Sequence, residues 1–283
     1  MEEKIMLIKA NAKINWALDV TGIREDGYHL LDMIMQKIDL FDIIEILPCS
    51  ELSLRIDGND ELSSGEDNLV MRAARILDPE GIHGAAIRLE KHIPQGAGLG
   101  GGSADAAAML KALNGYWQIG LSDRQLSVLG LRLGADIPYC LTDSPARVQG
   151  IGEKIIPFSV PCSFPVIIAM PDSRISTKEV YAAWSSTPRI HPPISAIISQ
   201  MENGSFYDTS SDTINALYPP AVLMCDEIGN IRQMLMKYGA AMAEMTGSGS
   251  AVYSVFGNEE IAEKAYGEMK NRVPFCVLTH TCI

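Results

Sequence analysis

The stretch Pro94-Gln95-Gly96-Ala97-Gly98-Leu99-Gly100-Gly101-Gly102-Ser103-Ala104 decides the fold of this chain. Five of the seven residues from 96 to 102 are glycines, and the residues that follow have the composition of a helix. Glycine tolerates positive φ, so a glycine-rich turn can point its N–H groups inward, and the helix N-terminus adds partial positive charge. So many glycines are costly to order in a mere turn. The stretch therefore predicts a cradle for nucleotide phosphates.

The residues around this stretch predict a mixture of strands and helices. Ser103 stands where a helix N-cap belongs and Asp105 in the first turn of a helix over 103–116, with a second helix over 122–133 and an earlier one capped by Asn68. The alternation of Ile14 and Trp16 with polar or small residues predicts a half-buried strand. We expect further strands at 43–47, 52–56, 85–91 and 166–170, a strand pair within 240–256 and a helix over 259–271.

The order of these elements indicates an α+β protein of two domains, because strands and helices do not alternate regularly as in a doubly wound sheet. Prolines become frequent between 157 and 165, which predicts a boundary that separates domains 1–157 and 158–283. Glycines 96, 98 and 101 also fit G-x-G-x-x-G. The context of a dinucleotide site is missing, because no acidic residue follows at the end of a second strand. A dehydrogenase is thus a distant alternative.

The overall composition limits the partners of the chain. Its 283 residues carry a formal net charge of −12, so we expect neither nucleic acid nor a membrane surface as a partner. The six cysteines are scattered, which is typical of free thiols in a reducing compartment. No apolar run approaches the roughly 18 residues of a membrane helix. We expect a cytoplasmic protein.

Three further segments contain candidate functional residues. They are 10–15 (ANAKIN) with 24–29 (REDGYH), 133–138 (LGADIP), and 246–252 (TGSGSAV). Taken alone, Lys13 fits an ordinary surface lysine equally well, and Asp136 fits a loop or capping aspartate. Tyr28 could be a half-buried loop aromatic, His29 a loop histidine, and Tyr181 a core residue.

Together with the glycine-rich turn, these segments resemble the three motifs of the GHMP kinase superfamily. Within it, A-K-I-N, R-x-D-G-Y-H and G-A-D-I-P resemble the branch that phosphorylates a cytidyl-diphosphate substrate of the non-mevalonate isoprenoid pathway. The resemblance extends from residue 10 to residue 256. Asn11 stands where this branch usually has proline, and Tyr181 where phenylalanine can occur. The implied fold has an N-terminal domain like the second domain of ribosomal protein S5 and a ferredoxin-like C-terminal domain.

The resemblance also implies roles for individual residues. It implies that residues 94–104 hold the phosphates of ATP with Mg²⁺, that Asp136 is the general base, and that Lys13 is the cation beside it. The residues implied in binding the cytidyl-diphosphate substrate are Asn15, Tyr28, His29, Thr177 and Tyr181, the two tyrosines sandwiching the cytosine. It leaves the metal ligands unassigned, and we expect a monomer or a weak homodimer.

Two alternatives stay open at this point. One is another GHMP kinase, of the homoserine or mevalonate type, from which the Tyr28–His29 pair would distinguish this chain. The other is a non-catalytic nucleotide-binding relative that acts as a sensor.

Overall fold

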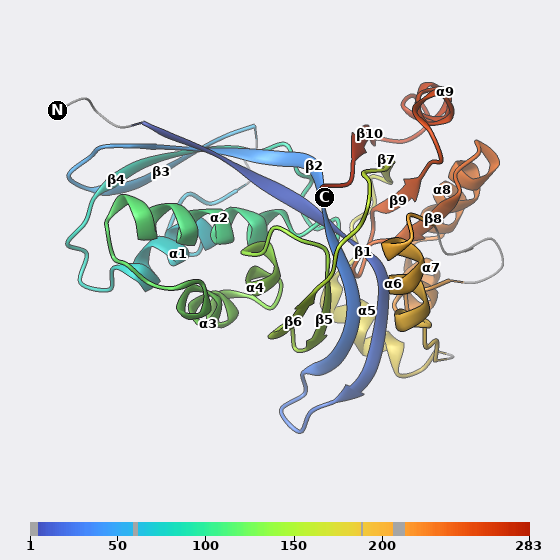
Figure 1. Cartoon of the computed structure of the whole chain (residues 1–283), viewed down its shortest axis with the longest axis horizontal. Helices are drawn as coiled ribbons and strands as arrows, with labels where there is room; N and C mark the ends of the chain where they lie inside the picture. Colours follow the sequence, from blue (N-terminus) through green and yellow to red (C-terminus); the bar gives the residue numbers. More distant parts are fainter. Residues whose placement is uncertain (1–4, 59–61, 188, 206–212) are drawn as a thin grey trace. The chain divides into compact units, whose positions relative to one another are not determined.

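The computed structural model describes residues 5–58, 62–187, 189–205 and 213–283 (Figure 1). Contacts within the chain group it into two compact units. Unit 1 is Met1–Ala12, Leu40–Gln95 and Gly100–Asp143, and unit 2 is Lys13–Asp39, Gly96–Leu99 and Ser144–Ile283. The long strands β1 (Met6–Ile23) and β2 (His29–Leu47) contribute to both units. Each unit consists of three separate stretches of the chain. The sequence predicts instead a single boundary after residue 157, and that boundary stays a prediction.

Unit 1 combines strands with a group of helices. The end of β2 pairs antiparallel with β4 (Ala85–Glu90), and β3 (Leu52–Asp57) pairs parallel with β4. The helices are α1 (Leu69–Leu77), α2 (Gly101–Tyr116), α3 (Asp123–Leu133) and α4 (Ile137–Cys140). Helix α2 packs against the other three. The side chain of Asn68 caps α1, as the sequence predicts, and Ser122 forms a capping box with Gln125 at the start of α3.

Unit 2 contains the start of β2 paired with β5 (Ala146–Gly150), which pairs with β6 (Lys154–Pro157). A separate antiparallel sheet has the order β10-β7-β9-β8, from Phe275–His280, Pro165–Met170, Val252–Val255 and Met242–Met245. Helices α8 (Glu227–Lys237) and α9 (Glu259–Met269) pack on this sheet. The remaining helices of this unit are α5 (Thr177–Trp184), α6 (Ile194–Glu202) and α7 (Tyr218–Met224).

Strand β1 differs from the half-buried strand that its alternation predicts. Every residue from 13 to 20 is buried, the polar ones included. The polar side chains tolerate burial because they have partners: Asp19 pairs with His191 at 3.0 Å, and Lys13 donates to Asn15. The face that the sequence pattern assigns to solvent therefore carries buried polar groups. Among the described residues, no helix has the length and apolar character needed to cross a membrane.

Candidate active site

The glycine-rich turn has the backbone that its sequence predicts. Gly96, Gly98 and Gly100 all have positive φ, at 66°, 76° and 70°. Gly98 is also closely packed, because a Cβ there would lie 2.2 Å from the carbonyl oxygen of Thr246. The turn thus needs glycine at Gly98 for two reasons, conformation and space.

The structure at the end of the turn shows that two predictions from the sequence are wrong, the one for Ser103 and the one for Asp105. Helix α2 begins at Gly101 with Gly100 as N-cap and no side-chain cap, so Ser103 is inside the helix and is not its cap. Asp105 lies just beyond the first turn of the helix, buried, where its carboxylate contacts Lys91 at 2.7 Å. The N-cap Gly100 is in the left-handed region, and it has no side chain that could accept the N–H groups of the first turn.

Lys13 is a buried residue in unit 2. Its side chain is 3% exposed, and its Nζ donates to Asn15 Oδ1 at 2.7 Å and to the carbonyl of Gly98 at 2.9 Å. Its backbone N–H donates to the carbonyl of Leu99. The interpretation as a surface lysine is therefore wrong. Strand β1 instead presents an ammonium group directly to the first half of the glycine-rich turn.

The small-residue turn at 246–250 joins the same cluster. Thr246 Oγ1 accepts the backbone N–H of Asn15 at 3.0 Å, and the N–H of Ala251 donates to the carbonyl of Ala97. Three segments that are remote in sequence thus meet within unit 2. Thr246, which the sequence did not single out although its segment has small residues, thus contacts both Asn15 and Gly98.

Asp136 belongs to unit 1, at the N-cap position of the short helix α4. It is half-buried, and its side chain makes no capping hydrogen bond, so the capping interpretation finds no support. A Cβ at Gly134 would lie 3.9 Å from Ser103 Oγ. The segment that carries Asp136 therefore lies beside the first turn of α2 within this unit.

An aromatic cluster in unit 2 contains two of the predicted substrate residues. The His29 ring lies 4.7 Å from that of Tyr181 and 5.8 Å, edge-on, from that of Trp184. Burial lowers the pKa of His29, which keeps the imidazole neutral and able both to donate and to accept a hydrogen bond. Trp184, one turn after Tyr181 on α5, is 2% exposed and is a core residue, as a tryptophan at helical spacing indicates.

The other predicted substrate residues are placed individually. Tyr28 lies in the turn between β1 and β2 and is 61% exposed, with its N–H donating to Asp26 Oδ1. Thr177, at the start of α5, shares a hydrogen bond of 2.8 Å with Ser248 of the 246–250 turn. Asn15 is buried against Lys13. The structure thus brings Thr177 and Asn15 to one turn through Ser248 and Thr246.

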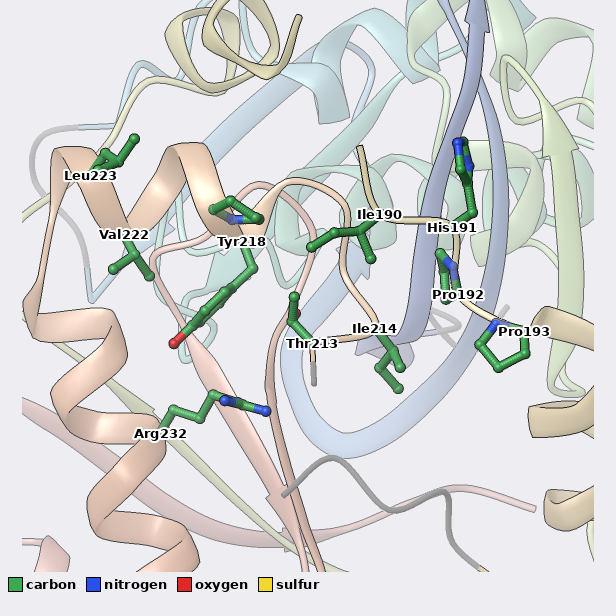
Figure 2. Close-up of a pocket in the computed structure, with 11 residues that line it drawn as sticks. Ile190, His191, Pro192, Pro193, Thr213, Ile214, Tyr218, Val222, Leu223 and Arg232 are labelled. Atoms are coloured by element: carbon green, nitrogen blue, oxygen red, sulfur yellow. The ribbon is translucent and has the colours of Figure 1, made fainter. Parts of the chain in front are cut away.

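A cavity of about 580 Å³ in unit 2 lies elsewhere and contains none of the predicted site residues (Figure 2). Its wall is largely apolar, with Arg232 stacked over the ring of Tyr218 at 5.3 Å. In the described part of the chain, no three or more His, Cys, Asp or Glu side chains are grouped to hold a metal ion. The metal ligands therefore stay unassigned.

Comparison with known proteins gives the class of this protein. The GHMP kinase N-terminal domain matches residues 68–144 and the GHMP kinase C-terminal domain matches residues 198–274. The chain belongs to the GHMP kinase family, whose members are phosphotransferases that use ATP, and its two-domain α+β fold is that of the family.

Individual relatives within this family are similar to the chain over most of its length. A 4-diphosphocytidyl-2-C-methyl-D-erythritol kinase from Clostridium beijerinckii is 40% identical over 280 residues, covering 98% of this chain and 100% of the relative. One from Clostridioides difficile is 39% identical over 90% of this chain and 88% of its own. A crystal structure of 4-(cytidine 5'-diphospho)-2C-methyl-D-erythritol kinase superposes with a TM-score of 0.82 at 30% identity, covering 98% and 100% of the two chains. A homoserine kinase from Cytophaga hutchinsonii, with a TM-score of 0.75 at 18% identity over 100% of this chain and 96% of its own, shares the fold.

Proposed function

We propose that this kinase transfers the γ-phosphoryl group of ATP to the 2-hydroxyl of 4-diphosphocytidyl-2-C-methyl-D-erythritol, a step of the non-mevalonate isoprenoid pathway. The observation that carries the proposal is the 40% identity, over 98% of the chain, to a relative of that name. Two observations support it. The ammonium group of Lys13 lies against the glycine-rich turn, and the rings of His29 and Tyr181 are in contact.

The chemistry would rest on positioning and electrostatics, as in phosphoryl transfer generally. Residues 94–104 would hold the triphosphate through backbone N–H groups and the N-terminus of α2. Asp136 would accept the proton of the attacking hydroxyl. Lys13 would keep that carboxylate ionised and stabilise charge on the transferred group.

Mg²⁺ would arrive with the nucleotide and neutralise charge on its phosphates. Such a metal needs only one or two protein carboxylates besides phosphate oxygens. The lack of a larger acidic cluster in the described residues is compatible with that arrangement.

The acceptor would bind through the aromatic cluster. Tyr181 and Tyr28 would stack on the cytosine, and the neutral His29 would bond to its edge. Thr177 would contact the acceptor. Asn15, which accepts a hydrogen bond from Lys13, would contact the acceptor or orient the lysine. We further propose that the enzyme is cytoplasmic, since its six cysteines are free thiols. We also propose that it is monomeric or weakly dimeric.

An ADP-release assay over a panel of acceptors tests this proposal. We expect turnover with 4-diphosphocytidyl-2-C-methyl-D-erythritol, and little with mevalonate or homoserine. Preference for either of the latter would reject the proposed substrate but not the kinase class. ATP binding without turnover of any acceptor would instead indicate a nucleotide sensor.

A further inference from the structure

Unit 1 contains a buried charge cluster that sequence analysis did not select, formed by Lys91, Asp42 and Asp105. The three side chains are 5%, 0% and 4% exposed. Lys91 Nζ donates to Asp42 Oδ2 and, at 2.7 Å, to Asp105 Oδ2. The other oxygen of Asp42 accepts the backbone N–H groups of His92 and Ile93, the latter at 2.8 Å. The cluster thus connects strand β2, the chain just after β4, and helix α2.

This cluster lies at both ends of the glycine-rich turn. Asp42 holds the chain at Ile93, just before the turn, and Asp105 holds helix α2, just after it. A Cβ on Gly101 would lie 2.9 Å from Ile93 Cγ2 and 3.5 Å from Lys91 Nζ. The entrance of the turn therefore contacts its exit, with the Lys91 ammonium beside the first helical residue.

Stability alone is a poor reason for such a cluster. Replacing a buried ionic triad with apolar residues is often neutral or stabilising, because desolvation offsets the attraction between the charges. Burial raises the pKa of Asp105 to about 7, against the opposing effect of Lys91. Asp105 Oδ1 is also buried without a hydrogen-bond partner. Ionising this carboxyl group therefore costs more free energy in the folded than in the unfolded protein.

We propose that Lys91 is a positioning residue for ATP: its bridge from Asp42 to Asp105 fixes the N-terminal part of α2 against the end of β4. The bridge sets the spacing between the backbone N–H groups on the two sides of the glycine-rich turn. Lys91 acts through the backbone and does not touch the phosphates. This role rests on the proposed binding of ATP at the turn.

The test compares Asp105→Ala with Asp105→Asn. Asparagine keeps an oxygen that accepts from Lys91, whereas alanine removes the bridge to α2. Because a hydrogen bond to a charged group is lost, we expect Asp105→Ala to raise KM for ATP roughly tenfold or more. We expect its KM for the acceptor to be nearly unchanged. Asp105→Asn should bind ATP like wild type.

Two further variants complete the experiment. Asp105→Leu fills the volume that alanine leaves, and it gives the same answer should Asp105→Ala fail to fold. Asp143→Ala is the matched control. It removes an exposed carboxylate that pairs at 3.1 Å with Lys111, a residue of the helix α2 that also contains Asp105. This control should leave both KM values unchanged.

The outcomes separate this inference from the proposed function. Unchanged KM for ATP in Asp105→Ala and Asp105→Leu, with wild type binding ATP, overturns the positioning role alone. A lower melting temperature without a change in KM for ATP does the same, because it indicates a purely structural cluster. Failure of the wild-type protein to bind ATP in calorimetry rejects the proposed function itself.

Discussion

At the scale of single residues, the proposed chemistry of this kinase depends on Asp136 and Lys13. Asp136 makes no capping hydrogen bond, and Lys13 is buried against the carbonyl of Gly98. The capping interpretation of Asp136 and the surface interpretation of Lys13 are thus not supported. Asp136→Asn keeps the shape of the side chain and removes the proton acceptor.

We therefore expect kcat of Asp136→Asn to fall by about 10²–10⁴-fold, with little change in either KM. Lys13→Met should also lower kcat, and the double variant should lose less than the product of the two single losses, because the groups act as a unit. Steady-state kinetics at saturating ATP, with melting curves, measures this. Full turnover in Asp136→Asn would remove Asp136 as the base.

Asp105 gives a second prediction at this scale, on the pH dependence of stability. Its pKa in the folded protein is about 7, raised chiefly by burial, while that of an unfolded aspartate is about 4. Between these values the folded state holds the proton more tightly, so the carboxyl's contribution to the free energy of unfolding falls as pH rises.

Asp105→Asn should remove this penalty. The variant should match wild type near pH 4 and gain stability relative to it up to pH 8, by about 4 kcal/mol at most. Denaturant unfolding at pH 5 and pH 8 measures the difference. An equal difference at the two pH values would contradict a raised pKa.

At the scale of elements, the glycine-rich turn offers a matched pair of positions. Gly98 and Gly96 have similar positive φ, but a Cβ at Gly98 would lie 2.2 Å from the Thr246 carbonyl, whereas one at Gly96 meets nothing within 4 Å. Both substitutions to alanine carry conformational strain, and only one adds a clash with backbone.

We expect Gly98→Ala to weaken ATP binding much more than Gly96→Ala, because the clash displaces the carbonyl that holds Lys13. Calorimetric titration with ATP compares the two variants. Equal losses would mean that conformation alone, and not the contact with the 246–250 turn, requires glycine at this position.

At the scale of the whole molecule, residues far apart in sequence form the aromatic cluster. His29 and Tyr181 are separated by about 150 residues of chain, and their rings lie 4.7 Å apart. If Tyr181 stacks on the cytosine, Tyr181→Ala should weaken acceptor binding by roughly 1–3 kcal/mol and leave ATP binding unchanged.

Titration with each ligand separately tests this expectation. Tyr266→Ala, on helix α9, is a control aromatic substitution that should leave acceptor binding unchanged. Parallel losses of both ligands in Tyr181→Ala would show that the ring supports the fold and does not bind the base.

Local sequence determined the features that depend on neighbouring residues. Positive φ in the glycine-rich turn, the Asn68 cap of α1 and the start of α3 after Ser122 follow from side-chain and backbone chemistry within a few positions. The family and its reaction class also follow from short segments, because their residues are specific to one chemistry.

Tertiary structure alone decided which polar residues are buried and what they contact. Local sequence left Lys13 open to a surface position and placed Asp105 in the first turn of a helix, yet both are buried, one against the carbonyl of Gly98 and the other against Lys91. The physical reason is that burial of a charge depends on partners brought by remote segments, and a local pattern contains no information about them.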